Sequence, residues 1–183
     1  MTLQRFVYEN RGPLIAPPLL LALLYPRGMA GHAREFWLAG LFIFGLGMWG
    51  RVWAQQHLHF RLRDVDNALT RTGPYRWVRN PIYISNTLLC VGLTVLSQNL
   101  WLVPVTLAWC LAFYTIVIKE EEERLLELYG TPYGDYLRET SRWLPRRSVN
   151  EPVRVRGYLL KSLIAEAHNL LLLVPFIIKK VLF

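Results

Sequence analysis

The chain has 183 residues, of which 53% are hydrophobic and seven are tryptophan, and its formal net charge is +8. This hydrophobic content is high for a soluble domain, and the charges occur in blocks separated by long apolar stretches. In a membrane protein, basic residues set orientation and contact anionic lipid, so the positive charge does not indicate nucleic-acid binding. The composition therefore favours an all-α integral membrane protein that contacts membrane lipids.

Two apolar segments open the chain, at residues 12–26 and 36–54. The first follows basic residues and shares this feature with signal peptides. Two adjacent prolines inside it, and further apolar segments behind it, favour a helix that is retained. The second has Arg51 as its only charge, and this side chain can extend to the membrane interface. Both are predicted membrane spans, and together they form an N-terminal region, residues 1–54.

A polar connection follows at residues 55–79, where arginines outnumber acidic residues. It has no long apolar period and ends near a Gly73-Pro74 turn, which predicts an interfacial helix followed by an ordered loop. His57 and His59 are two positions apart and do not share a helical face, so we expect no metal site there.

From Asn80 to Ile118 no Asp, Glu, Lys or Arg occurs. A bilayer helix takes about 20 apolar residues, so this stretch predicts a transmembrane hairpin with a polar turn at residues 97–99. The turn carries no charge, whereas the connection at 55–79 is rich in arginine. The positive-inside rule therefore places that connection, the N-terminus and the chain after Ile118 in the cytoplasm. The only two cysteines of the chain fall inside the hairpin helices and are expected to be packing residues.

The second hairpin helix is expected to project beyond the membrane, because residues 111–129 lack Gly and Pro and Gly130 supplies a stop. Its projecting part carries four consecutive glutamates, residues 120–123. On a helix, Glu121 and Glu122 fall on the apolar stripe and the outer two face away from it. An inward carboxylate is costly unless a cation pairs with it, and that cation could be a ligand. The alternative is a solvated run of charges.

The loop at residues 67–75 and the helix start at 79–83 form a second candidate site. A Gly-Pro turn, two tyrosines and a helix N-terminus could surround a small polar ligand. The alternative is an interfacial aromatic belt with orienting arginines. We therefore expect residues 55–149 to be the functional core. The remaining region, 150–183, ends in an apolar stretch interrupted by Pro175 and is predicted to be a tilted, re-entrant or interfacial helix.

The ordered motifs between about residues 45 and 145 resemble the membrane methyltransferases typified by isoprenylcysteine carboxyl methyltransferase and the related phospholipid methyltransferases. A Gly-Pro-Tyr turn and an Arg-x-Pro-x-Tyr helix start precede the hairpin, and a Glu-Glu pair and spaced tyrosines follow it. The matching residues are Leu69, Gly73, Pro74, Tyr75, Arg79, Pro81, Tyr83, Glu121, Glu122, Leu125, Tyr129, Gly130, Tyr133, Tyr136, Leu144 and Pro145.

The resemblance implies an enzyme that uses S-adenosylmethionine on the cytoplasmic side and methylates a lipophilic small molecule or a lipid headgroup arriving from the bilayer. Carried over by position, the cofactor-binding residues are Gly45, Gly47, Asn67, Ala68, Leu69, Thr70, Tyr75, Asn80, Pro81, Ile82, Tyr83 and Glu121. Glu122 and Arg79 are the candidate catalytic residues, facing the acceptor or supporting the cofactor shell. The cofactor's sulfonium and ammonium would give Glu121 a cationic partner, and tyrosine faces attract the same charge.

Three positions depart from the family pattern. Asn67 and Asn80 stand where the family usually has histidine, and Val117 stands where it has an arginine for the prenylcysteine carboxylate. Asparagine does not titrate near neutral pH, so any imidazole role is absent. A non-catalytic ligand-binding protein of the same fold is therefore an alternative. A sterol-reductase-like oxidoreductase is another, because membrane sterol reductases share part of the C-terminal pattern. The expected fold has four to five transmembrane helices, a helical hairpin and a cytoplasmic C-terminal cofactor-binding part, and the oligomeric state is not predicted.

Overall fold

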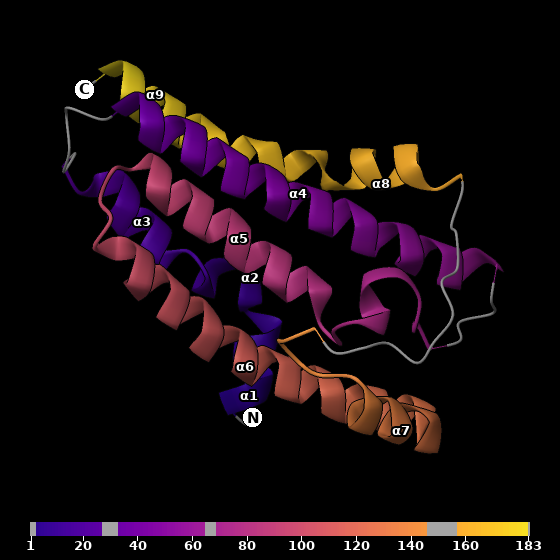
Figure 1. Cartoon of the computed structure of the whole chain (residues 1–183). Helices are drawn as coiled ribbons and strands as arrows, with labels where there is room; N and C mark the ends of the chain where they lie inside the picture. Colours follow the sequence, from indigo (N-terminus) through magenta and orange to yellow (C-terminus); the bar gives the residue numbers. More distant parts are fainter. Residues whose placement is uncertain (1–2, 27–32, 65–68, 146–156, 183) are drawn as a thin grey trace.

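The computed structural model describes residues 3–26, 33–64, 69–145 and 157–182, which form helices, turns and an isolated parallel bridge between Val78 and Ser141. In chain order the helical elements are α1 (Leu3–Glu9), α2 (Arg11–Leu14), α3 (Pro17–Leu24), α4 (Ala33–Asp64), η2 (Gly73–Arg76), α5 (Pro81–Leu96), α6 (Leu102–Tyr129), α7 (Thr131–Glu139), α8 (Leu159–Glu166), η3 (Ala167–Leu173) and α9 (Val174–Leu182). Helices α4, α5 and α6 lie side by side, with α5 in the middle (Figure 1). The predicted all-α fold is confirmed.

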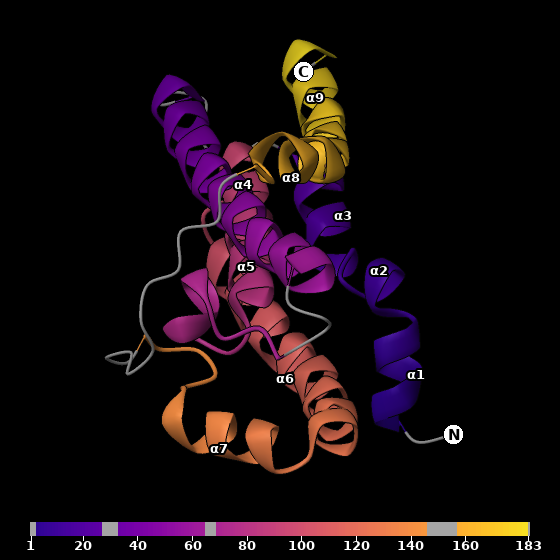
Figure 2. The same cartoon turned by 90° about the vertical axis from the view of Figure 1, so that its right-hand side faces the viewer.

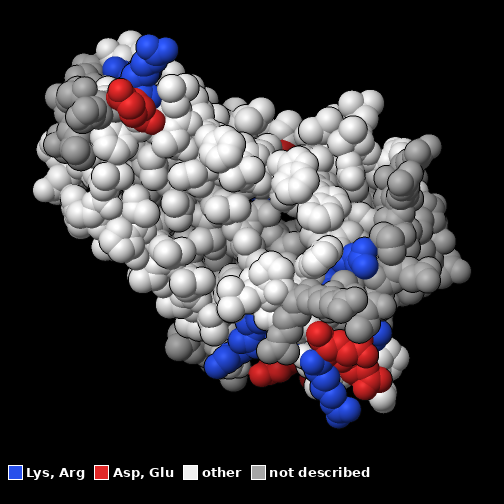
Figure 3. Space-filling view, viewed as in Figure 1, with Lys and Arg blue, Asp and Glu red and all other residues white. Residues whose placement is uncertain are grey.

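In the described part of the chain, three helical stretches are long and apolar enough to cross a bilayer: Ala33–His59, Leu102–Tyr129 and Leu159–Val181. Helix α5 is also apolar, but its 16 residues rise only about 24 Å, less than the hydrocarbon thickness of about 30 Å. On the face shown in Figure 3, Lys, Arg, Asp and Glu gather mainly toward the two ends of the molecule and leave most of the surface between them uncharged. These features identify an integral membrane protein.

The first predicted span, residues 12–26, is not a continuous helix. It is divided between α2 and α3, and α3 begins at Pro17. Pro17 and Pro18 have no N–H to donate to the carbonyls four residues earlier, so the helical ladder stops and restarts there. The N-terminal segment therefore packs along α6 and α5 as short helices.

Helix α4, in contrast, is longer than predicted. The sequence predicted a span ending near Ala54 and a separate interfacial helix, but α4 is a single helix of 32 residues that ends at Asp64. No Gly or Pro occurs between Arg51 and Asp64, so nothing in the backbone interrupts it. This continuation brings the last turns of α4 beside η2.

The predicted hairpin is confirmed, with α5 and α6 joined by a tight turn after Leu96. Helix α5 approaches α4 closely: a Cβ added at Gly92 would lie 2.9 Å from the Gly40 carbonyl oxygen. The predicted extent of α6 is also confirmed, because the helix continues without a break to Tyr129 and ends where Gly130 adopts a φ of +59°.

The C-terminal segment, α8 to α9, runs back along α4 to the end of the molecule opposite α7 (Figures 1 and 2). There Lys179 Nζ donates to the carbonyl oxygens of Ala22, at 2.9 Å, and Tyr25, at 2.6 Å. The sequence predicted a tilted, re-entrant or interfacial helix, whereas the 23 residues from Leu159 to Val181 are long enough to cross a membrane. The central 3₁₀ stretch, η3, separates its two α-helical parts.

Candidate functional site

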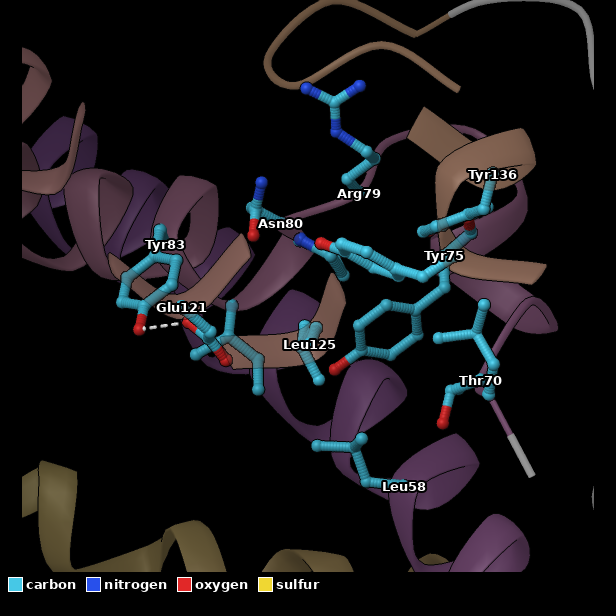
Figure 4. A pocket seen from close by; sticks show the side chains of 13 residues that line it. Leu58, Thr70, Tyr75, Arg79, Asn80, Tyr83, Glu121, Leu125 and Tyr136 are labelled. Atoms are coloured by element: carbon cyan, nitrogen blue, oxygen red, sulfur yellow. Dashed lines mark hydrogen bonds between the residues drawn. The ribbon is translucent and has the colours of Figure 1, made fainter. Parts of the chain in front are cut away.

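A cavity of about 330 Å³ lies where the last turns of α4, the start of α5, the projecting part of α6, and α7 meet (Figure 4). We call this end of the molecule the cavity end. The lining residues are Leu58, Leu69, Thr70, Tyr75, Arg79, Asn80, Pro81, Ile82, Tyr83, Glu121, Leu125, Tyr133 and Tyr136. This volume falls within the range of about 300–1,000 Å³ that is typical of small-molecule sites.

Glu121 extends from α6 into this cavity. Its Oε2 accepts a hydrogen bond of 2.6 Å from the hydroxyl of Tyr83, and the Tyr83 ring packs against Tyr114 with a centroid distance of 5.0 Å (Figure 4). None of the Lys or Arg side chains that the structure describes forms an ion pair with Glu121, whereas its neighbour Glu120 pairs with Arg124 at 3.1 Å. A half-buried carboxylate with a neutral partner is a candidate binding group for a cation.

Glu122, one position further along α6, is neutralised by the protein itself. It pairs with Arg79 at 3.0 Å and with Arg142 at 2.5 Å. Arg79 Nη1 also donates to the carbonyl oxygens of Leu137 and Thr140, each at 2.7 Å. In Figure 4 the Arg79 guanidinium points away from the carboxylate–tyrosine pair. Arg79 and Glu122 thus connect the start of α5 to α6 and α7.

The loop before α5 is held from both sides. At Gly73, φ is +59°, and an added Cβ would lie 2.2 Å from the His57 ring, so the turn requires glycine. His57 Nδ1 lies 2.8 Å from Thr72 Oγ1, and the Tyr136 hydroxyl donates to the Tyr75 carbonyl oxygen at 2.7 Å. Helices α4 and α7 therefore fix the position of Tyr75 at the cavity wall.

Two polar atoms of the cavity wall are buried without a hydrogen-bond partner in the described part of the chain: Thr70 Oγ1 and Asn80 Nδ2. Such atoms are rare in folded proteins, and each leaves a hydrogen bond that a ligand or a water molecule could supply. Burial raises the pKa of the Tyr133 and Tyr136 hydroxyls, so both stay neutral at physiological pH. The wall thus combines neutral hydrogen-bonding groups with the carboxylate of Glu121.

The structure brings together most of the residues predicted to bind the cofactor. Those that line the cavity are Leu69, Thr70, Tyr75, Asn80, Pro81, Ile82, Tyr83 and Glu121. Asn67 and Ala68 lie outside the described residues. Gly45 is exposed on α4, and Gly47 packs on α5, where an added Cβ would lie 2.9 Å from the Ser85 carbonyl oxygen. Neither glycine lines the cavity.

Four lining residues, Leu58, Leu125, Tyr133 and Tyr136, were predicted neither as cofactor-binding nor as catalytic residues. Leu125 follows Glu121 by four residues, and Tyr136 follows Tyr133 by three, so helical spacing places each pair on a common face. The spacing of these residues could therefore have predicted that they line the site. Leu58 joins the site because α4 continues past its apolar part, and no local pattern indicates that.

Most residues that line the cavity fall in a region that matches a known protein family. The model of the phospholipid methyltransferase family matches residues 36–132. Similar curated proteins are the cobalt-zinc-cadmium resistance protein CzcN of Cupriavidus metallidurans, 31% identical over 131 residues (65% of this chain, 57% of the relative), and the nickel-cobalt-cadmium resistance protein NccN of Alcaligenes xylosoxydans xylosoxydans, 26% identical over 144 residues (74% and 63%).

The chain therefore spans less than two thirds of the length of these two relatives. No solved structure matches it. The family match covers more than half of the chain and contains α5, η2, α6 and nearly all of α4. On this match, the chain belongs to the phospholipid methyltransferase family.

Proposed function

We propose that this protein binds S-adenosylmethionine in the cavity and catalyses methyl transfer to a lipophilic small molecule or a lipid headgroup. The observation that carries the proposal is the Glu121 carboxylate, which faces the cavity, accepts a hydrogen bond from Tyr83, and lacks an ion-pair partner among the described Lys and Arg residues. A ligand with a sulfonium and an ammonium is the kind of cation that such a carboxylate binds. The family supplies the reaction class, methyl transfer.

Other groups in the cavity fit the same ligand. Thr70 Oγ1 and Asn80 Nδ2 belong to residues of the cavity wall, and their hydrogen-bonding capacity is unused in the described part of the chain. The aromatic faces of Tyr75 and Tyr133 can attract its positive charge. When bound, the cofactor supplies an electrophilic methyl group, so the protein needs no nucleophile of its own. Its residues bind the donor, fix its direction relative to the acceptor and exclude water.

An apolar hollow beside the cavity could admit a lipophilic acceptor. A hollow of about 480 Å³ lies on the other side of Pro81, and Pro81 lines both it and the cavity. The wall of this hollow includes Trp49, Trp53, Trp77 and Trp143. Aromatic and apolar walls suit an acyl or isoprenoid chain and would leave the polar end of the acceptor beside the start of α5.

We place the cavity end on the cytoplasmic side of the membrane. The support is the concentration of arginines around the loop before α5, set against an uncharged turn between α5 and α6 at the other end. Labelling of single cysteines introduced at exposed Asp135 or at Leu100 with a membrane-impermeant reagent in sealed cells would test this. Labelling of the Leu100 variant alone is expected, and labelling of the Asp135 variant alone would contradict the placement.

The enzymatic proposal is tested by transfer of labelled methyl from S-adenosylmethionine into a total lipid and metabolite extract. Wild-type protein is expected to give a labelled product, and Glu121→Gln to give at least about tenfold less, because a charge-assisted contact is lost. The matched control is Glu123→Gln, an exposed carboxylate on the same turn, which should retain wild-type activity. Equal activity of the Glu121 and Glu123 variants would contradict the assigned role.

A second candidate is a non-catalytic protein that binds the same ligand. It is favoured by Asn80, which lies in the cavity wall where the family usually has histidine. Tight binding of S-adenosylhomocysteine, together with no labelled product from any extract, would favour this candidate over the enzyme.

A further inference from the structure

A cluster of polar side chains lies within the apolar layer, outside the cavity lining. Arg51 of α4 donates from Nε to Glu166 Oε2 at 2.6 Å and from Nη1 to Asn86 Oδ1 of α5. Glu166, at the end of α8, has a fractional exposure of 4% and also accepts a hydrogen bond of 2.9 Å from Asn169 Nδ2. The cluster therefore joins α4, α5 and the C-terminal segment.

Holding α8 against α4 does not by itself require an ion pair. Two charges buried at this depth lose several kcal/mol of hydration, and apolar side chains of similar size often stabilise a contact as well. An apolar pair cannot replace the planar guanidinium of arginine, which donates hydrogen bonds to two acceptors at once in fixed directions. Here the two acceptors are Glu166 and Asn86, so the pair fixes the Asn86 side chain as well as α8.

From Asn86 a series of neighbouring side chains leads to the cavity. Asn86 lies one turn after Tyr83 on α5, and the side chains of Asn86 and Arg51 are near enough to the Tyr114 hydroxyl to interact with it electrostatically. The Tyr114 ring packs against the Tyr83 ring with an interplanar angle of 40°. Tyr83 in turn donates to Glu121. A change in the direction of Asn86 would thus reach the tyrosine that orients the cavity carboxylate.

We infer that Arg51 is a positioning residue for this site: anchored by Glu166 of the C-terminal segment, it holds Asn86 and Tyr114 so that the Tyr83 hydroxyl is directed at Glu121. The C-terminal segment lies outside the family match at residues 36–132, so it would set the geometry of a site that the family region contains. The effect on cofactor affinity rests on the proposed function, whereas the effect on Tyr83 does not.

The first test is the affinity for S-adenosylhomocysteine, measured by isothermal titration of detergent-purified full-length variants. Arg51→Lys keeps the charge but cannot hold Glu166 and Asn86 together, and Arg51→Met combined with Glu166→Leu replaces the ion pair with apolar side chains. Both are expected to weaken binding about threefold to tenfold, the size of a typical coupling between contacting residues. Arg5→Lys, at the exposed Arg5–Glu9 pair, is the control and should bind like wild type.

A double-mutant cycle separates positioning from general damage. If Arg51 acts through the Tyr83 hydroxyl, Arg51→Lys should weaken binding in the wild-type background and cause no further loss in a Tyr83→Phe background. The same fold-loss in both backgrounds would overturn the inference, and so would a lowered unfolding temperature with unchanged affinity.

Fluorine NMR of ligand-free protein labelled with 3-fluorotyrosine tests the geometry without the cofactor. The Tyr83 resonance, assigned by its loss in Tyr83→Phe, is expected to shift in both Arg51 variants and to stay in place in Arg5→Lys. An unchanged Tyr83 resonance in the Arg51 variants would overturn the inference, whatever the affinities.

Absence of binding by wild-type protein would overturn the proposed function alone, and the fluorine spectra would then decide the role of Arg51.

Discussion

The two ends of the helical core use their charged side chains differently. At the end far from the cavity, the two lysines of α9 join elements to one another: Lys179 donates to the carbonyls of Ala22 and Tyr25, and Lys180 lies 4.2 Å from the centroid of the Trp37 ring. These contacts attach α9 to α3 and α4. Both lysines thus serve internal packing, while Arg34 and Glu35 at the start of α4 are exposed.

The cavity end contains both kinds of charge. Arg79, Glu122 and Arg142 form an internal cluster, but Glu121, adjacent to Glu122 in sequence, faces a cavity with Tyr83 as its partner. Adjacent residues on one helix therefore have separate roles, one structural and one available to a ligand. Variants of residues with a structural role should therefore lower stability, and variants of residues available to a ligand should weaken binding.

The largest expected effect on stability is that of Glu122→Ala. The change leaves Arg79 and Arg142 without their shared carboxylate in a site where the exposed fraction of the Glu122 side chain is 12%. We expect the free energy of unfolding to fall by about 3 kcal/mol, measured by thermal or denaturant unfolding in detergent. Glu9→Ala, at the exposed Arg5–Glu9 pair spaced four residues apart, should cost less than about 0.5 kcal/mol. Equal losses in the two variants would contradict the structural role of Glu122.

A change at the helix contact between the two ends should affect stability and leave ligand binding intact. Gly92→Ala places a Cβ 2.9 Å from the Gly40 carbonyl oxygen, so α5 and α4 must move apart, at a cost of about 1–3 kcal/mol. Gly45→Ala, where the added Cβ meets no atom within 4 Å, is the control for stability. The same control tests the predicted cofactor role of Gly45, since a loss of affinity in Gly45→Ala would support that role.

A smaller effect is expected from Tyr136→Phe, which removes the hydrogen bond from α7 to the Tyr75 carbonyl. Loss of one buried hydrogen bond should cost about 1 kcal/mol of stability and weaken S-adenosylhomocysteine binding severalfold, because Tyr75 lies in the cavity wall. Unfolding and titration of the same preparation give both values. Unchanged affinity would show that the position of Tyr75 does not depend on α7.

The smallest effect concerns alkaline pH. Burial raises the pKa of Tyr133 and Tyr136 above the unfolded value of about 10, so the folded protein retains these protons after the unfolded chain has released them. Their contribution to stability is complete below pH 10 and is lost as the pH rises through the folded pKa. Unfolding temperatures measured from pH 8 to pH 11 should fall above about pH 10, less steeply in a Tyr133→Phe, Tyr136→Phe variant. The same slope in wild type and variant would contradict this.

Local signals predicted the parts of the fold that depend on local composition. The uncharged run before Lys119 predicted the hairpin, and Gly130 predicted the end of α6. The helical-face argument placed Glu121 on the inward side, and the structure places it at the cavity. Each of these follows from residues that are neighbours in sequence or one helical turn apart.

The remaining features depend on contacts between distant residues. Glu122 was also predicted to face inward, but its partner Arg142 lies 20 positions away, and no local pattern indicates that pairing. The pairing of Arg51 with Glu166 spans 115 positions. The contact of His57 with Thr72 forms because α4 continues beyond its apolar part. The polar sequence after Ala54 had instead predicted a separate helix there.

The central claim is that Glu121, and not its neighbours, binds the cationic end of the cofactor. The most direct measurement is isothermal titration of detergent-purified wild type, Glu121→Gln and Glu123→Gln with S-adenosylmethionine. We expect wild type and Glu123→Gln to bind equally, and Glu121→Gln to bind about tenfold to a hundredfold more weakly, as loss of a charge-assisted contact predicts. Wild-type affinity in Glu121→Gln, or no binding by wild type, would contradict the account.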